Sequence, residues 1–66
     1  MNRIKEVLKD KGISQTWLAK QTDKSYNTIN EYARNVRQPS LEDLYIIAVI
    51  LNVEVKDLLI ERKNIK

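Results

Sequence analysis

Residues 41–51, LEDLYIIAVIL, form the segment that most constrains the fold, because as a helix it would be apolar on almost every side. Ser40 precedes it as a helix N-cap, Pro39 fixes the chain before that cap, and Asn52 ends the segment. Such a helix must be covered on most of its sides. The remainder of the chain is expected to pack around it, with part of the cover supplied by a second copy.

The other segments predict short amphipathic helices. Ile4, Val7 and Leu8 share one helical face before Gly12, and serines stand at two further helix starts, Ser14 and Ser25. No alternation of apolar and polar residues is long enough for a sheet. The 66 residues therefore predict one all-α domain over 1–66, a compact bundle of five short helices at about 2–11, 15–21, 26–34, 41–51 and 55–62.

The composition excludes several classes of function. The chain has no Cys and no His, which removes disulfides, thiol nucleophiles, the usual zinc ligands and the commonest general base. Its carboxylates are scattered as caps and surface charges, so we expect no enzyme, catalytic residue, cofactor, metal or small-molecule ligand. The longest apolar run, 44–51, is far short of the ~20 residues that a membrane helix needs. A cytoplasmic protein without a membrane partner is predicted.

The charge is distributed unevenly. Residues 1–38 hold eight Lys+Arg and four Asp+Glu, or +4, whereas residues 39–66 hold four and five, or −1, which together give the net +3. A basic N-terminal part beside a nearly neutral, apolar C-terminal part suggests a polyanionic partner.

The segment 26–34 is unusually rich in short polar side chains for a helix. Asn and Thr each cost roughly half a kcal/mol relative to Ala in a helix. Asn27, Asn30, Glu31 and Arg34 follow the spacing i, i+3, i+4 and i+7 and so share one face. Asn can bond adenine N6 and N7, Glu can accept from cytosine N4, and B-DNA's major groove admits a helix. This pattern indicates DNA recognition.

The flanking residues fit the same interpretation. Ser14 and Gln15 begin the preceding helix, where free backbone N–H groups attract phosphate. Lys24, Arg34 and Arg37 lie near the ends of the 26–34 helix, where they would contact the flanking DNA backbone.

Residues 14–59 resemble the Cro/Xre-type helix-turn-helix domain, the lambda-repressor-like fold of bacterial and phage regulators. The ordered set that carries this resemblance is Ser14, Gln15, Leu18, Ala19, Ser25, Thr28, Ile29, Pro39, Ser40, Leu44, Ile47, Ala48, Leu51, Val53, Leu58 and Leu59. The resemblance implies that helices two and three form the DNA-binding unit and that helix three, 26–34, enters the major groove.

The resemblance also implies roles for individual residues. The positions that face bases are Tyr26, Asn27, Asn30 and Glu31. The positions that touch phosphate or support the base readers are Gln15, Ser25, Thr28, Arg34, Asn35 and Arg37. A homodimer on a palindromic operator is expected, and the apolar residues that the bundle cannot cover should form its interface: Ile46, Val49, Ile50, Ile60 and Ile65.

The chain departs from the family pattern at several positions. Asp23 replaces the usual turn glycine, and Asn35 stands where a glycine often ends helix three, so both need a left-handed backbone. Lys24 replaces an apolar residue and is expected to lay its stem over the core while extending its charge. Trp17 replaces a capping-box Glu and is expected to pack into the fold, with a contact to a base or a partner as the alternative.

A sequence-specific regulator of transcription, such as a repressor, is the leading hypothesis. One alternative is the antitoxin of a toxin–antitoxin pair, which would bind a toxin protein as well as DNA. The other is the controller of a restriction–modification operon.

Overall fold

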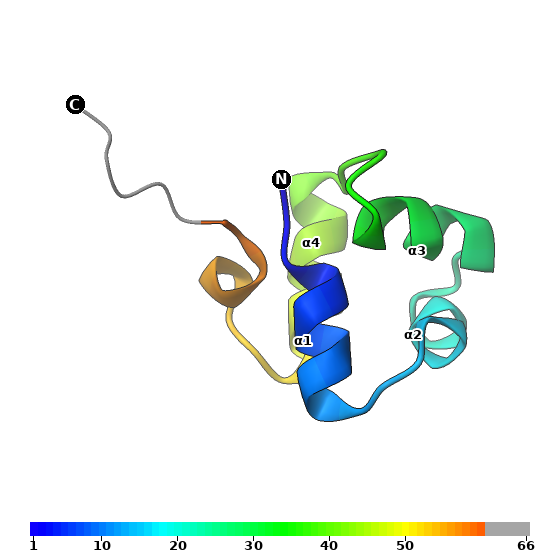
Figure 1. The fold of residues 1–66 in the computed structure, drawn as a ribbon, viewed down its shortest axis with the longest axis horizontal. Helices are drawn as coiled ribbons and strands as arrows, with labels where there is room; N and C mark the ends of the chain where they lie inside the picture. Colours follow the sequence, from blue (N-terminus) through cyan, green and yellow to red (C-terminus); the bar gives the residue numbers. More distant parts are fainter. Residues whose placement is uncertain (61–66) are drawn as a thin grey trace.

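The computed structural model of the chain describes residues 1–60. Along this part, the elements are α1 (Ile4–Lys11), α2 (Gln15–Thr22), α3 (Tyr26–Ala33), α4 (Leu41–Leu51) and a 3-10 turn, η1 (Val55–Leu58). α2 and α3 lie at one end of the molecule, and η1 lies at the other, with α1 and α4 between them (Figure 1). The predicted all-α bundle with a helix-turn-helix is confirmed.

The fifth element is shorter than predicted. It is a single 3-10 turn over Val55–Leu58 rather than a helix over 55–62, of which residues 61 and 62 lie outside the described part. Leu59 is extended, with φ −108° and ψ 150°, because its backbone pairs with Asn2 in an isolated antiparallel bridge. The same pairing keeps Asn2 and Arg3 out of α1, which begins at Ile4 rather than at residue 2.

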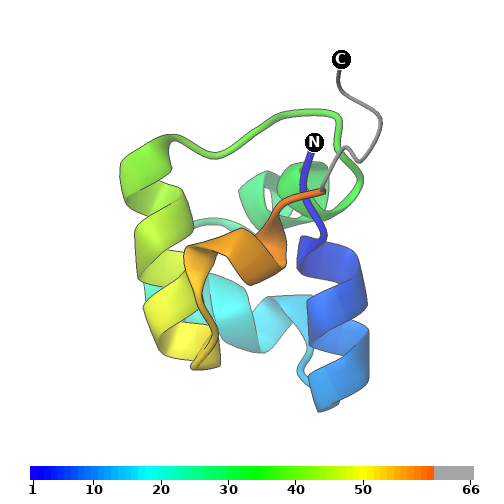
Figure 2. The same cartoon turned by 90° about the vertical axis from the view of Figure 1, so that its left-hand side faces the viewer.

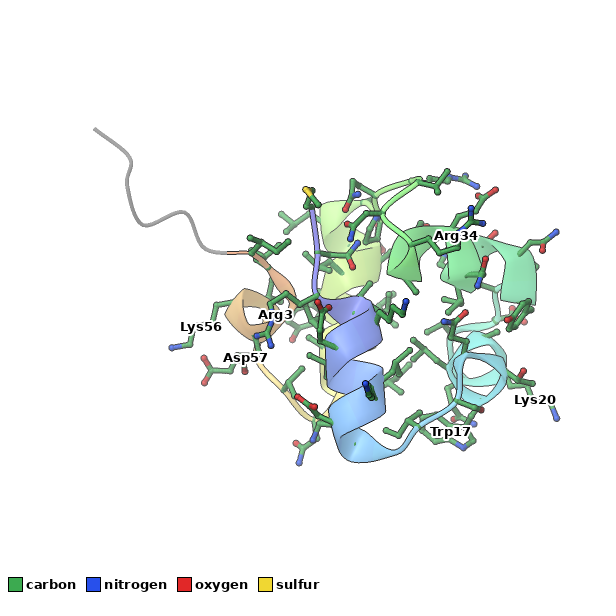
Figure 3. All side chains as sticks on the ribbon, in the orientation of Figure 1. Arg3, Trp17, Lys20, Arg34, Lys56 and Asp57 are labelled. Atoms are coloured by element: carbon green, nitrogen blue, oxygen red, sulfur yellow. The ribbon has the colours of Figure 1, made fainter. Side chains whose placement is uncertain are left out.

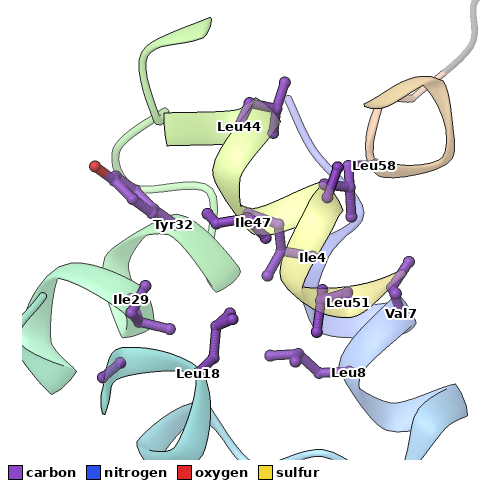
Figure 4. Packing of buried hydrophobic residues seen from close by; sticks show 12 residues of the cluster. Ile4, Val7, Leu8, Leu18, Ile29, Tyr32, Leu44, Ile47, Leu51 and Leu58 are labelled. Atoms are coloured by element: carbon purple, nitrogen blue, oxygen red, sulfur yellow. The ribbon is translucent and has the colours of Figure 1, made fainter. Parts of the chain in front are cut away.

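One core joins all five elements. Six side chains are fully buried at its centre (Figure 4): Ile4, Leu18, Ile29, Ile47, Leu51 and Leu58. Since each element contributes at least one of these residues, the orientation of α2 and α3 is fixed by the same apolar contacts that stabilise the whole domain.

α4 is covered on one face only. Leu44, Ile47, Ala48 and Leu51 are buried, as the sequence pattern requires for a central helix. The opposite face remains apolar and open to solvent, with Leu41 76% exposed, Tyr45 63% and Val49 60%. Within residues 1–60, nothing covers this second face of α4, which the sequence predicted would need cover.

The helix ends follow the sequence signals. The hydroxyls of Ser14, Ser25 and Ser40 each accept a hydrogen bond from the backbone N–H three residues later, at 3.0, 3.1 and 3.1 Å. Asp23 and Asn35 both adopt a φ of 59°, in the left-handed region predicted for them. Asparagine and aspartate tolerate this conformation better than other residues with a Cβ, so the turn on either side of α3 is retained without glycine.

Candidate nucleic-acid interface

The first turn of α3 presents two side chains to solvent. Tyr26 is 50% exposed and Asn27 is exposed as well, while Ile29 and Tyr32 on the opposite side of the helix are buried. The Ser25 hydroxyl accepts from the Thr28 N–H and donates to the Thr28 hydroxyl at 3.0 Å, which closes the start of the helix. Ser25 and Thr28 thus support the turn that carries Tyr26 and Asn27.

A chain of hydrogen bonds links α2 to α3. The Asn30 amide donates to the Gln15 side-chain oxygen at 3.0 Å and accepts from the Arg34 guanidinium at 3.3 Å. Both ends of the Asn30 amide are therefore engaged inside the protein. This arrangement leaves the Gln15 amino group as a donor at the start of α2, and it orients Arg34 near the end of α3.

Asn30 is thus placed differently from Asn27, although the sequence predicts that both read bases. A bidentate contact with adenine needs one donor and one acceptor of an amide, and Asn30 already uses one of each in its bonds to Gln15 and Arg34. Its position favours orienting Gln15 and Arg34.

Glu31 forms an ion pair with Arg37. The Arg37 guanidinium lies 3.4 Å from the Glu31 carboxylate, and the Arg37 and Glu31 side chains remain 60% and 40% exposed, respectively. Exposed pairs of this kind contribute at most about 1 kcal/mol. The pair therefore holds both side chains on the same edge of α3 without preventing either from exchanging its partner for a nucleic acid.

Asn35 is engaged at the N-terminus of the chain. Its side-chain oxygen accepts from the Asn2 N–H at 2.8 Å, and its amino group donates to the Asn2 carbonyl at 3.2 Å. Of the two roles predicted for its position, phosphate contact or support, this geometry favours support. The sequence gives no sign of the part that Asn2 plays, because a polar residue before an amphipathic helix is usually exposed.

Lys24 does not extend its charge outward as predicted. Its ammonium group lies 3.0 Å from the Asp43 carboxylate at the start of α4, and both side chains are about three-quarters covered. The hydrogen bond with Asp43 raises the pKa of Lys24, and the same bond lowers the pKa of Asp43. Lys24 therefore ties the α2–α3 turn to the start of α4.

Replacing Asp43 by asparagine should remove a pH-dependent part of the stability. Since the pKa of Asp43 is lowered in the folded state, its contribution is present above the carboxyl's ordinary pKa and disappears as the pH falls through the folded value. We expect Asp43→Asn to lose about 0.5–1 kcal/mol at pH 7 and much less at pH 2.5. Urea unfolding at both pH values measures this, and an equal loss at the two would contradict the assigned ion pair.

Trp17 is not a core residue, contrary to prediction. It is 43% exposed and lies on the outer side of α2, well separated from Arg34 (Figure 3). Because Leu18 and Ala19 supply the buried face of α2, the neighbouring position 17 is turned away from the core.

The predicted interface residues on the C-terminal half are only partly accessible. Ile46, Val49 and Ile60 are exposed, whereas Ile50 is partly buried against the core. Ile65 lies outside the described residues. Leu41 and Tyr45, which the prediction omitted, share the exposed face of α4 with Val49 through the spacing i, i+4 and i+8.

Two further features of the described part concern other kinds of site. Among residues 1–60, we find no group of three or more His, Cys, Asp or Glu side chains that could hold a metal ion. The helices of this region are all too short or too polar to cross a membrane.

Comparisons with known proteins agree with this geometry. The helix-turn-helix family model HTH_3 matches residues 4–58. A crystal structure of a candidate DNA-binding protein from Bacteroides fragilis is 46% identical, with a TM-score of 0.86, and the match covers 88% of this chain and 94% of that one. The N-terminal DNA-binding domain of SinR from Bacillus subtilis is 33% identical, with a TM-score of 0.75, over 91% and 88%. No curated protein matches the chain. The chain belongs to the Cro/C1-type helix-turn-helix family.

Proposed function

We propose that the protein is a transcription regulator that binds double-stranded DNA by inserting α3 into the major groove. The observation that carries this proposal is the exposed pair Tyr26 and Asn27, held on a helix whose other face is locked into the core. The two structural relatives support it, since both are described as DNA-binding proteins or domains.

Asn27 has the chemistry of a base reader. Its amide can donate to adenine N7 and accept from adenine N6, and the ring of Tyr26 beside it can pack on a thymine methyl group. Neither residue belongs to the Gln15–Asn30–Arg34 hydrogen-bond chain. Glu31, paired with Arg37, is placed to accept from a cytosine amino group when Arg37 moves to a phosphate.

The surroundings of α3 suit the DNA backbone. Gln15 stands at the N-terminus of α2, where the helix dipole and the free N–H groups favour an anion. Arg34 and Arg37 are exposed at and after the C-terminal end of α3. Phosphate contacts on both sides of the reading helix would set its register along the groove.

Arg37→Ala should weaken binding to every duplex. Loss of one phosphate contact should flatten the plot of log affinity against log salt by about one unit. Fluorescence anisotropy with a random-sequence duplex at several KCl concentrations measures that slope.

Lys56→Ala is the matched control for Arg37→Ala. It removes the same charge from η1, at the opposite end of the molecule from α3 (Figure 3). We expect its slope to stay close to that of the unmodified protein. If the two variants gave the same slope, Arg37 would be only one part of a general positive field.

We further propose that two copies associate through the exposed apolar face of α4, with Ile46 and Val49 at its centre. A two-fold dimer would place two α3 helices on half-sites about one helical turn apart, roughly 34 Å. Sedimentation equilibrium should detect dimers at micromolar concentrations, and Val49→Asp should abolish them. A strict monomer at high micromolar concentration would contradict this part of the proposal.

A further inference from the structure

Asn2 is the one polar residue buried within the described part of the chain, with 2% of its surface exposed. Its side-chain amino group donates to the Tyr32 carbonyl at 3.0 Å and to the Gln38 side-chain oxygen at 2.9 Å. Its side-chain oxygen accepts from the Ile4 N–H at 3.0 Å. The Asn2 backbone N–H and carbonyl bond to Asn35, as described above. Every polar group of Asn2 therefore has a hydrogen-bond partner, as a buried polar residue requires.

These bonds hold the segment that follows α3. Tyr32 is in the last turn of α3, and Asn35 and Gln38 belong to the loop toward α4. Gln38 also donates to the Asn35 side-chain oxygen at 3.1 Å, which closes the network. Asn2 is therefore bonded to this segment at three points spread over seven positions.

The N-terminal segment is itself fixed from its other side. The Arg3 N–H donates to the Leu58 carbonyl at 2.8 Å, next to the bridge between Asn2 and Leu59. The N-terminus runs between residues 59–60, which follow η1, and the end of α3 (Figure 1 and Figure 2). The loop after α3 is thus anchored through Asn2 to the part of the molecule farthest from α2.

Between the three residues that Asn2 contacts lie the two arginines that the proposed function assigns to phosphate. Arg34 and Arg37 are exposed, while Asn35 and Tyr32, on the inner side, contact Asn2. We propose that Asn2 is a positioning residue for DNA binding, which holds the segment 34–38 so that Arg37 meets the DNA backbone already ordered. This inference rests on the proposed function, and it assigns a role in binding to a residue that cannot itself touch DNA.

The test compares variants inside and outside the network. Asn2→Ala removes the bonds to Tyr32, Gln38 and Ile4. Gln38→Ala changes an exposed residue and removes its bonds with Asn2 and with Asn35. Val7→Ala is the control, because Val7 is buried in α1, outside the network, and its loss lowers stability without touching the loop. All are measured by anisotropy with a fluorescein-labelled random-sequence duplex, below their unfolding temperatures.

We expect Asn2→Ala to flatten the salt dependence by about one unit, as Arg37→Ala does, and Gln38→Ala to flatten it less. The double variant Asn2→Ala/Arg37→Ala should match Arg37→Ala alone, because both changes remove the same contact. Amide exchange at Val36 and Arg37 should accelerate at least tenfold in Asn2→Ala and stay unchanged in Val7→Ala. If Asn2→Ala does not fold, Gln38→Ala decides by the same two readouts.

Slopes in Asn2→Ala and Gln38→Ala equal to that of Val7→Ala would overturn the inference while leaving the proposed function intact. Absence of binding by the unmodified protein to any duplex would instead overturn the proposed function, and the positioning role with it.

Discussion

Asn27→Ala is expected to weaken binding to the preferred duplex by about 1–3 kcal/mol while barely changing binding to random-sequence DNA. Asn27 is exposed on the first turn of α3, where an amide can meet an adenine edge. Alanine is a better helix former than asparagine, so the variant should fold at least as well. Parallel anisotropy titrations with both duplexes measure the two losses.

Asn30→Ala provides the contrast. Its amide holds Gln15 and Arg34, both assigned to the DNA backbone. Its removal should therefore weaken binding to the preferred and the random duplex by similar factors. If Asn27→Ala also weakened binding to both duplexes equally, Asn27 would not be a base reader. The contrast drawn between Asn27 and Asn30 would then be wrong.

The largest effect on folding is expected from Ile47→Ala. Ile47 is fully buried at the centre of the core, between α4 and the other helices (Figure 4). Truncating a buried isoleucine to alanine costs about 2–5 kcal/mol through lost burial and the cavity left behind. In a domain of this size that is a large part of the whole stability, so the variant should be substantially unfolded near 37 °C.

Val49→Ala is the control on the same helix. Val49 lies two positions away and is 60% exposed, so the change should shift the free energy of unfolding by no more than about 0.5 kcal/mol at low protein concentration. A loss that grows with protein concentration would indicate that Val49 is covered in a dimer. Equal losses for both variants at high dilution would contradict the observed division of α4 into a buried and an exposed face.

Local sequence signals predicted the capped starts of α2, α3 and α4 and the left-handed residues on either side of α3. Ser14, Ser25 and Ser40 each supply a hydroxyl to a backbone N–H within three residues, and Asp23 and Asn35 tolerate a left-handed backbone. These effects depend only on neighbours in the chain, so the residue types are sufficient to identify them. The family match adds the arrangement of the helices.

Interactions between distant residues could not be predicted in the same way. Lys24 pairs with Asp43, Asn30 bonds to Gln15, and Asn2 bonds to Asn35, and in each case the partner is brought close only by the packing of helices. In the sequence alone, each of these polar groups would be equally suited to an exposed position. In the structure, Tyr26 and Asn27 are exposed, whereas the Asn30 and Asn35 side chains are hydrogen-bonded within the protein.

Selection of bound duplexes from a random DNA pool tests the central claim most directly, because such a pool offers α3 every possible half-site at once. We predict enrichment of sequences that carry two inverted half-sites about one helical turn apart, and loss of that enrichment with Asn27→Ala. A pool that remains random after repeated rounds in dilute buffer would contradict the claim that α3 reads DNA.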